Sequence, residues 1–516
     1  MTAILLIHPP AAKPSEAPPG IAALAGCLRR HGIACAQLDA NLEGFLYLLE
    51  QTQPPEVNDS WSRRALKHRA GNLVALRSPE LYRNVDRYQR AVRDLNRALE
   101  LLARSRPAIS LSLSNYQDES DPLASDDLLL AAKHPEQNPF FPWMEARLPA
   151  LMEEVQPAWI GLSLCYLSQA LCTFALLGHL KQRWPEVKLA LGGGLLSSWM
   201  ARPGWTDPFA SLVDCCIQGP GETALLRLLG YEGPVEDAPP DYSDLPLADY
   251  LAPGPILPFA ASRGCYWNRC TFCPETAEHN RYQPMAPQTV VSQLAQLSQT
   301  IQPSLIHLLD NALSPALLQA LAAQPPGPPW YGFVRFHEQL ADVDFCRRLR
   351  ASGCVLLKLG LESGSQRVLD AMDKGIRLEL AERVFAALHQ AGIATYVYLL
   401  FGTPTESLAE ARATMAFVQR YHAAISFLNL AIFNMPASSA EAKNLPGATF
   451  SAGDLSLYLD FVHPLGWDRR SIRTFLDREF KRQPEIAAIL RRDPPLFTSN
   501  HAAFFGGQFP WLKGKD

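Results

Sequence analysis

Three cysteines lie close together in the sequence: Cys265, Cys270 and Cys273, separated by four and then two residues. Three thiolates can hold three irons of a [4Fe–4S] cubane and leave the fourth iron open to another ligand. A cluster that only transfers electrons would need a fourth cysteine, and the sequence has none nearby. The triplet therefore predicts a [4Fe–4S] cluster with one open iron.

A zinc site is the alternative that these residues leave open. His279 follows Cys273 by six residues and would complete a tetrahedral Cys₃His set. A zinc protein of this kind could be non-catalytic. The position of the cysteines directly after a candidate strand favours the iron cluster.

The elements that must position the cysteines form an alternating β/α pattern over residues 259–445. Helices are expected between most of the strands, which together predict an incomplete (β/α)₆ barrel. A small helical C-terminal region, residues 446–516, is expected to follow. The candidate strands are Phe259–Ser262, Ile306–Leu309, Trp330–Arg335, Val355–Leu361, Thr395–Phe401 and Ser426–Phe433.

The cysteine loop and several later motifs resemble the radical S-adenosylmethionine (SAM) superfamily. The usual spacing there is three residues and then two, one residue shorter than in this chain. The resemblance implies that the open iron binds SAM and that an electron from the cluster cleaves SAM to a 5′-deoxyadenosyl radical. It also implies a low-potential reductant such as flavodoxin or ferredoxin.

The same resemblance implies which residues bind SAM. The aromatic position beside the adenine is Phe272, and the position that meets the amino group is Asp310. The ribose motif of the fourth strand contains Glu362 and Ser363. The motif of the fifth strand, near the adenine, contains Gly402 and Glu406.

The first part of the chain predicts a separate α/β domain, residues 1–232. Its opening pattern is strand Ala3–His8, helix Ile21–His31 and strand Ile33–Asp39, which is a βαβ unit of a parallel sheet. The pattern turns helical and charged at about residues 45–155, which we interpret as a helical insertion. Strands then resume, so the domain is expected to be doubly wound. A proline-rich linker, residues 233–258, leads to the barrel.

Ligands of doubly wound sheets bind at the carboxyl ends of the strands. The candidates there are Asp39, Asn41, Ser163, Gly192 and Gly193. Their arrangement resembles the cobalamin-binding domain that precedes the barrel in the cobalamin-dependent branch of the superfamily. In the Asp-x-His-x-x-Gly motif of other cobalamin domains a histidine binds the cobalt, and Asn41 stands in its place.

A nucleotide-binding Rossmann domain is the alternative for this region. Pro9-Pro10 follows the first strand, where a Rossmann domain would have G-x-G-x-x-G.

Together the two regions resemble a cobalamin-dependent radical SAM enzyme. The resemblance implies a methyltransferase that acts on an unactivated carbon through the 5′-deoxyadenosyl radical and methylcobalamin. A radical SAM enzyme that rearranges, cyclises or oxidises its substrate is the alternative, and a non-catalytic protein that binds cobalamin or zinc is a further one. Tyr396 and Tyr398, on one face of a barrel strand, are candidates to reach the substrate.

The amino-acid composition argues against two classes of binding partner, nucleic acids and membranes. The net charge is −4 and the pI is near 6.3, without the basic surplus typical of nucleic-acid binding. The sequence has no apolar run of the roughly 18 residues that a membrane span needs. We therefore expect a cytoplasmic protein with no nucleic-acid or membrane partner. The substrate, a small molecule or a peptide, is not identifiable from these features.

Overall fold

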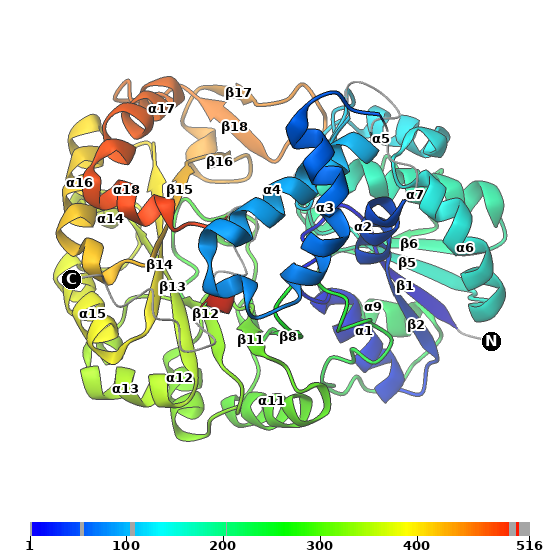
Figure 1. Cartoon of the computed structure of the whole chain (residues 1–516), viewed down its shortest axis with the longest axis horizontal. Helices are drawn as coiled ribbons and strands as arrows, with labels where there is room; N and C mark the ends of the chain where they lie inside the picture. The colour runs from blue at the N-terminus through cyan, green and yellow to red at the C-terminus, as the bar shows by residue number, and fades with distance from the viewer. Residues whose placement is uncertain (1–2, 52–55, 104–108, 203, 495–501, 505–516) are drawn as a thin grey trace. The chain divides into compact units, whose positions relative to one another are not determined.

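The computed structural model describes residues 3–51, 56–103, 109–202, 204–494 and 502–504 of the 516-residue chain. The chain forms two compact units (Figure 1). The first contains Met1–Pro255 and Ser451–Leu457, and the second contains Ile256–Phe450 and Tyr458–Pro494. The predicted α/β architecture, a doubly wound domain followed by a partial barrel, is confirmed.

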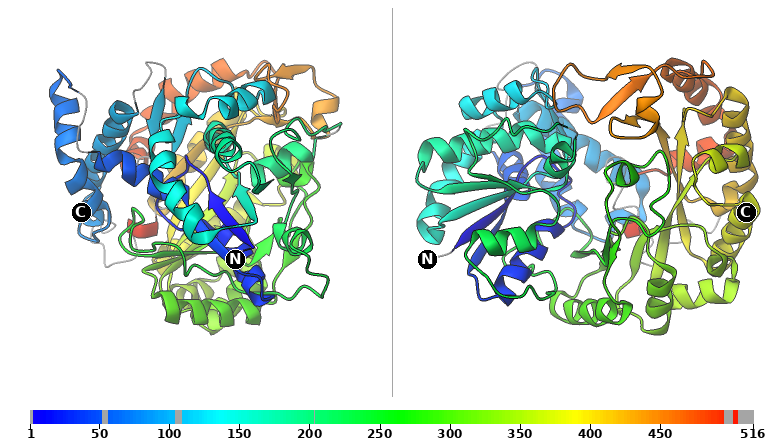
Figure 2. Two further views of the ribbon diagram at one scale, coloured as in Figure 1. Left: turned by 90° about the vertical axis from the view of Figure 1, so that its right-hand side faces the viewer. Right: turned by 180° about the vertical axis from the view of Figure 1, so that it is seen from behind.

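The first unit is built on a five-stranded parallel sheet with the order β2-β1-β5-β6-β7. Helices lie on both of its faces (Figure 2), and β1 is buried along its whole length for that reason. The strand order reverses between β1 and β5, which is where sheets of this kind bind ligands. The strands are β1 (Ile4–His8), β2 (Cys35–Asp39), β5 (Trp159–Ser163), β6 (Lys188–Gly192) and β7 (Cys215–Cys216).

The helices of this sheet begin and end at the expected residue types. Helix α1 starts with Pro19, whose fixed φ suits the first turn, and α2 is capped by Asp39. The covering helices are α1 (Pro19–Arg30), α2 (Ala40–Glu50), α7 (Ala170–Arg183), α8 (Gly194–Met200) and α9 (Gly221–Leu228).

The insertion is not entirely helical, so that part of the prediction was wrong. A hairpin of β3 (Ser110–Ser112) and β4 (Asn115–Gln117) interrupts it. Leu111 and Tyr116 face each other across the hairpin and are both buried, and strands this short leave no readable alternation. The helices are α3 (Ser60–Leu76), α4 (Val85–Leu102), α5 (Ser125–Lys133) and α6 (Phe141–Val155).

The proline-rich segment predicted as a linker packs onto the first unit up to Pro255. The Asp241 amide donates to the Ala22 carbonyl at 2.9 Å, and Asp241 pairs with Arg29 at 2.7 Å. A Cβ at Gly26 would lie 2.1 Å from the Pro239 carbonyl oxygen, so the segment lies directly against α1. Apolar residues along the segment, such as Tyr250, are buried against the first unit. The proline content of the segment did not indicate this packing.

The second unit contains the predicted barrel as an open six-stranded sheet with the order β15-β14-β13-β12-β11-β8. All neighbouring pairs are parallel. The first strand lies earlier than predicted, because Ser262–Arg263 (β9) instead pairs antiparallel with Gln283–Pro284 (β10). The strands are β8 (Ile256–Phe259), β11 (Leu305–Leu308), β12 (Trp330–Val334), β13 (Cys354–Glu362), β14 (Ala394–Phe401) and β15 (Phe427–Ile432).

Helices connect these strands. Ser314 caps α12 by accepting from the Leu317 amide at 3.2 Å, and Gly392 ends α15 with a φ of +69°. The helices are α11 (Pro287–Ile301), α12 (Pro315–Ala323), α13 (Val343–Ala351), α14 (Gln366–Ala371), α15 (Leu378–Ala391) and α16 (Leu408–Tyr421).

The C-terminal region is mixed, which corrects the prediction of a helical region. Helices α17 (Arg469–Arg478) and α18 (Pro484–Arg491) are present. Before them, β17 (Gly447–Thr449) and β18 (Tyr458–Phe461) form an antiparallel sheet with β16 (Met435–Pro436). Strands β17 and β18 also pair with each other, and at three and four residues they are too short for a readable alternation. Residues 495–501 and 505–516 of the predicted region lie outside the described residues.

Within the described residues, no helix is both long enough and apolar enough to span a membrane.

Candidate active site

The three cysteines lie in one loop of the second unit, between β9 and helix α10 (Pro274–Ala277). The pairing of β9 with β10 closes the base of this loop. Gly264 has a φ of +69°, and a Cβ there would lie 2.6 Å from the Arg281 carbonyl oxygen, so only glycine fits this approach. Cys270 is buried, whereas Cys265 and Cys273 are half-buried.

Two metals are compatible with the residue types of this loop. Across the described part of the chain, no group of three His, Cys, Asp or Glu side chains is already arranged around one ion position. A zinc ion with His279 needs four ligands around one position, whereas each cysteine of a cubane binds a different iron. Measurement of the bound metal decides between them.

In the absence of iron, burial raises the pKa of two of the three cysteine thiols. It raises the pKa of Cys273 to about 11. Burial also raises the pKa of Cys270, against the opposing charges of Lys374 and Arg335. The free thiols of Cys270 and Cys273 are therefore protonated near neutral pH, and binding of iron would displace those two protons.

A buried arginine reaches the loop from the end of β12. The Nη1 of Arg335 lies 3.7 Å from the Cys270 Sγ, and Nη2 donates to the Lys374 carbonyl. Its guanidinium also lies over the Trp267 ring, 4.4 Å from the ring centroid. The sequence analysis missed Arg335. Its place at the carboxyl end of a barrel strand was the one available signal.

The predicted SAM residues Phe272 and Glu362 lie on either side of Lys374. The Lys374 Nζ lies 2.7 Å from Glu362 Oε1 and 5.3 Å from the centroid of the Phe272 ring. Glu362 ends β13 with a φ of +66°. A Cβ at Gly360 would lie 2.6 Å from Glu362 Oε1, so this glycine makes room for the pair. No sequence motif had marked Lys374.

Asp310 holds the start of the cysteine loop. Its Oδ2 accepts from the Ala261 amide at 3.0 Å, and its Oδ1 accepts from the Ser262 hydroxyl at 2.5 Å. Burial raises the pKa of this carboxyl group. Its role in binding SAM stays a prediction, whereas its hydrogen bonds to the loop are evident.

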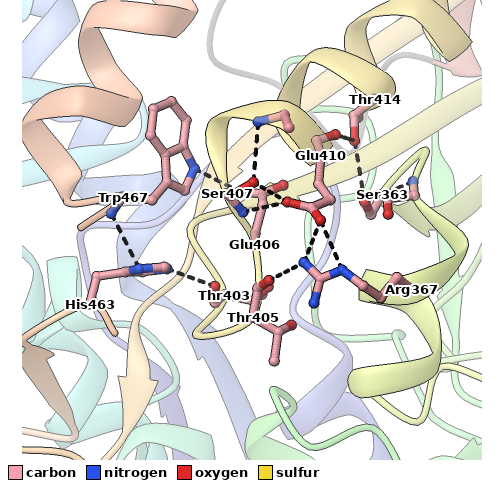
Figure 3. Close-up of polar contacts among 12 residues, drawn as sticks. Ser363, Arg367, Thr403, Thr405, Glu406, Ser407, Glu410, Thr414, His463 and Trp467 are labelled. Atoms are coloured by element: carbon pink, nitrogen blue, oxygen red, sulfur yellow. Dashed lines mark hydrogen bonds and ion pairs between the residues drawn. The ribbon is translucent and has the colours of Figure 1, made fainter. Parts of the chain in front are cut away.

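Ser363 joins two elements of the barrel (Figure 3). Its hydroxyl lies 3.2 Å from the Thr414 hydroxyl on α16, and it is fully buried. The Gly364 amide donates to the same Thr414 oxygen at 2.9 Å. These contacts fix the loop after β13, and the predicted ribose contact remains untested.

Glu406 and Gly402 lie against the C-terminal region (Figure 3). The Glu406 Oε2 accepts from the Gly402 amide at 2.5 Å and from the Trp467 indole at 3.1 Å. Gly402 has a φ of +84°, and a Cβ there would lie 2.4 Å from Ile472 Cδ1. The His463 Nε2 lies 2.8 Å from the Thr403 carbonyl. The sequence reasoning missed these contacts of Trp467 and His463, because nothing in the sequence pairs them with the fifth strand.

Tyr396 and Tyr398 have ring centroids 4.8 Å apart. Tyr396 is 1% exposed, and burial raises its pKa to about 12. Tyr398 also packs 4.8 Å from the Phe333 ring. Packing thus accounts for much of both side chains, and contact with a substrate stays a prediction.

In the first unit, two of the candidate residues make internal hydrogen bonds. Asp39 Oδ1 accepts from the Leu42 amide at 2.9 Å, and Oδ2 accepts from the Tyr250 hydroxyl at 2.7 Å. The Asn41 Oδ1 accepts from the Ala12 amide at 2.7 Å. Both side chains are buried, and these bonds order the loops after β1 and β2.

The other three candidates follow β5 and β6. A Cβ at Gly193, whose φ is +104°, would lie 2.4 Å from the Leu164 carbonyl oxygen, so this glycine is required by the fold. Gly192 has only ordinary contacts, the nearest at 3.7 Å. The Ser163 Oγ lies 3.4 Å from the Cys165 Sγ, and the next residue, Tyr166, is 58% exposed. This edge therefore carries one exposed aromatic side chain.

Comparison with known proteins gives a family for part of the chain. The sequence profile of the Radical SAM superfamily matches residues 260–418, which include the cysteine loop and strands β11 to β14. An uncharacterised methyltransferase of Pyrococcus horikoshii is 26% identical over 200 residues, which are 36% of this chain. The match spans 42% of the length of that relative.

Two solved structures share the fold over most of the chain. One is the radical SAM methyltransferase TsrM from Kitasatospora setae with cobalamin and a [4Fe–4S] cluster bound, at a TM-score of 0.50 and 16% identity. The match covers 88% of this chain and 82% of that one. The other is the cobalamin-dependent enzyme OxsB with aqua-cobalamin bound, at a TM-score of 0.58 and 12% identity, covering 92% and 67%.

Proposed function

We propose that this chain is a radical SAM enzyme and, more specifically, a cobalamin-dependent methyltransferase, because residues 260–418 match the sequence profile of the Radical SAM superfamily. The observation that carries the proposal is the cysteine loop, closed at its base by β9 and β10. The methyl acceptor would be an unactivated carbon of a small molecule or peptide.

In this proposal Cys265, Cys270 and Cys273 hold a [4Fe–4S] cluster. When bound, the cluster supplies the electron that cleaves SAM, and a cobalamin supplies the methyl group. Asp310 holds the start of the loop in place through the Ala261 amide. Buried Lys374 and Glu362 offer fixed charges of both signs beside Phe272, suited to the amino and carboxylate groups of an amino acid such as the methionine part of SAM. A low-potential reductant of the flavodoxin or ferredoxin type would deliver the electron.

The first unit supports cobalamin as the second cofactor. Its strand order reverses between β1 and β5, and the exposed Tyr166 follows β5. TsrM and OxsB, which share the fold, have cobalamin bound. Asn41 in place of a histidine would leave the cobalt without a protein ligand from this motif.

A radical SAM enzyme that does not transfer a methyl group is the second candidate. One observation favours it: the side chains of Asp39 and Asn41 are already used in internal hydrogen bonds. A domain that no longer bound cobalamin could keep those bonds as structural contacts.

The test is to reconstitute the chain without oxygen in iron, sulfide and hydroxocobalamin, desalt it, and measure iron and corrinoid. Cys270→Ser removes one proposed ligand, and Cys35→Ser, which changes a partly buried cysteine outside the loop, is the control. The proposal expects iron and one corrinoid in the unsubstituted chain and in Cys35→Ser, and less iron in Cys270→Ser.

The products of SAM then separate the two candidates. A methyltransferase of the proposed kind forms S-adenosylhomocysteine and 5′-deoxyadenosine together. Iron without corrinoid, and 5′-deoxyadenosine alone, would favour the second candidate. Zinc in place of iron, bound by the same cysteines, would overturn both.

A further inference from the structure

We propose that Arg335 is a positioning residue for the iron–sulfur cluster, and that its N–H group and charge at the Cys270 sulfur raise the cluster's reduction potential. This inference rests on the proposed function, because it assumes that Cys270 ligates the cluster. It adds a residue that belongs to none of the recognised motifs.

The first observation is the contact itself. The Nη1 of Arg335 donates to the Cys270 Sγ at 3.7 Å, within the range for a hydrogen bond to sulfur. Arg335 is only 7% exposed, so water screens the interaction little. An arginine side chain keeps its charge at any pH at which the protein is folded.

The second observation is that this guanidinium cannot easily turn away. Its Nη2 donates to the Lys374 carbonyl, and its plane lies 4.4 Å from the Trp267 ring centroid. Trp267 is fixed in turn, because its indole donates to the Asp373 carbonyl at 2.8 Å. Gly375 completes the arrangement, since a Cβ there would lie 2.0 Å from Trp267 Cζ2.

The effect on the cluster follows from charge. Reduction adds one electron, so the reduced cluster is more negative than the oxidised one. A fixed cation and an N–H donor at a ligating sulfur stabilise the more negative state, and both features are known to set potentials of such clusters. The reductant would therefore transfer its electron to this cluster more readily than to one without Arg335.

The chain supplies a matched control. Arg269 also lies over the Trp267 ring, 5.0 Å from its centroid, and pairs with Asp373 at 2.9 Å. It is largely exposed, and among the residues that the structure describes it makes no hydrogen bond to a cysteine sulfur. Arg269→Gln therefore removes a positive charge beside the same Trp267 ring without removing the contact to Cys270.

The experiment is a redox titration of reconstituted protein, followed by electron paramagnetic resonance, with iron measured in each sample. We expect Arg335→Gln to lower the equilibrium constant for reduction at least tenfold, a shift of about 59 mV to more negative potential for a one-electron couple. Arg335→Lys keeps the charge but loses the planar donor geometry, and a smaller shift in the same direction is expected. Arg269→Gln should leave the midpoint unchanged.

The outcomes separate this inference from the proposed function. Unsubstituted protein without a [4Fe–4S] signal would overturn the proposed function and this inference with it. Suppose instead that the cluster is normal and that its midpoint in Arg335→Gln and in Arg335→Lys equals that of the unsubstituted protein. This result would overturn only the inference. A shift in Arg269→Gln as large as that in Arg335→Gln would overturn it as well. Should Arg335→Gln fail to retain iron, Arg335→Lys decides, because an unchanged midpoint at full iron content contradicts the proposed role.

Discussion

The ammonium group of Lys374 lies 2.7 Å from the Glu362 carboxylate, and both side chains are buried. Lys374 belongs to the turn after α14, whereas Glu362 ends β13, so the pair ties this turn to the barrel. The cysteine loop joins the same place, because the Thr271 amide donates to the Met372 carbonyl at 3.1 Å. The turn after α14 therefore positions a charged pair and the cysteine loop at once.

Removing one partner of this pair should be costly. Lys374→Met leaves Glu362 buried without its cation, and a broken buried pair of this kind costs about 3–5 kcal/mol. We expect a clear fall in the thermal midpoint of the iron-free chain. Adding Glu362→Gln to Lys374→Met removes the uncompensated charge and should recover part of the loss. A double variant no more stable than Lys374→Met alone would argue that the pair is not what holds this turn.

Glu406 should make stability depend on pH. Burial raises its pKa to about 7 from 4.5. Between these values the folded chain keeps a proton that the unfolded chain has released, so stability falls as pH rises, by up to about 3 kcal/mol. Glu406→Gln removes this titration. Its thermal midpoint, relative to that of the unsubstituted chain, should therefore rise between about pH 5 and about pH 8.

Glu410 provides the control for that experiment. Burial raises its pKa, but hydrogen bonds from Ser407 and Arg367 outweigh burial and lower the pKa to about 2. Because its own titration lies below the window, Glu410→Gln should change the midpoint far less with pH than Glu406→Gln does. It removes only the smallest of the causes that act on the Glu406 pKa, the negative charge of Glu410. A pH-dependent difference as large in Glu410→Gln as in Glu406→Gln, or none in Glu406→Gln, would contradict the assignment.

Gly375→Ala should disturb the loop through Trp267. Its Cβ would lie 2.0 Å from the Trp267 ring, and the φ of +65° adds strain. Gly392→Ala is the matched control, because Gly392 has a φ of +69° and nothing within 4 Å of a Cβ. We expect the control to lose about 1 kcal/mol and Gly375→Ala to lose more and to retain less iron. Equal losses in both would mean that Trp267 moves aside without cost.

Asp310→Ala should weaken cluster binding by releasing the start of the cysteine loop. The substitution leaves the Ala261 amide and the Ser262 hydroxyl without their acceptor, at a cost of about 1–3 kcal/mol for a buried group. Iron per chain after reconstitution is the measurement. Asp468→Ala is the control. It removes a carboxylate that also accepts from a backbone amide, that of Ser471 at 2.7 Å, but that lies far from the cysteine loop in the sequence. Similar iron loss in both variants would point to general destabilisation.

Part of the site was predictable because its chemistry lies in adjacent residues. The spacing of Cys265, Cys270 and Cys273 determines which metal chemistry is available, and the β/α alternation determines the barrel that carries them. Most barrel strands agree with the predicted ranges, because buried parallel strands are continuous apolar runs. The order of the strands in the first sheet likewise agrees with a doubly wound domain.

Other features were set by partners distant in the sequence. Trp467 meets Glu406, Lys374 meets Glu362, and Arg335 meets Cys270, although none of these pairs shares a local motif. The C-terminal strands β17 and β18 were mistaken for part of a helical region because they are only three and four residues long, and one further partner, β16, lies outside that region.

The sequence by itself determined the cysteine triplet, the two-part α/β organisation and the family resemblance, since each depends on residue types at short spacing. Only the tertiary structure decided which buried charges surround the cysteine loop. It also decided that Asp39, Asn41 and Ser363 make internal hydrogen bonds. The physical reason is that a buried polar group must find a partner, and chain folding rather than sequence distance selects that partner.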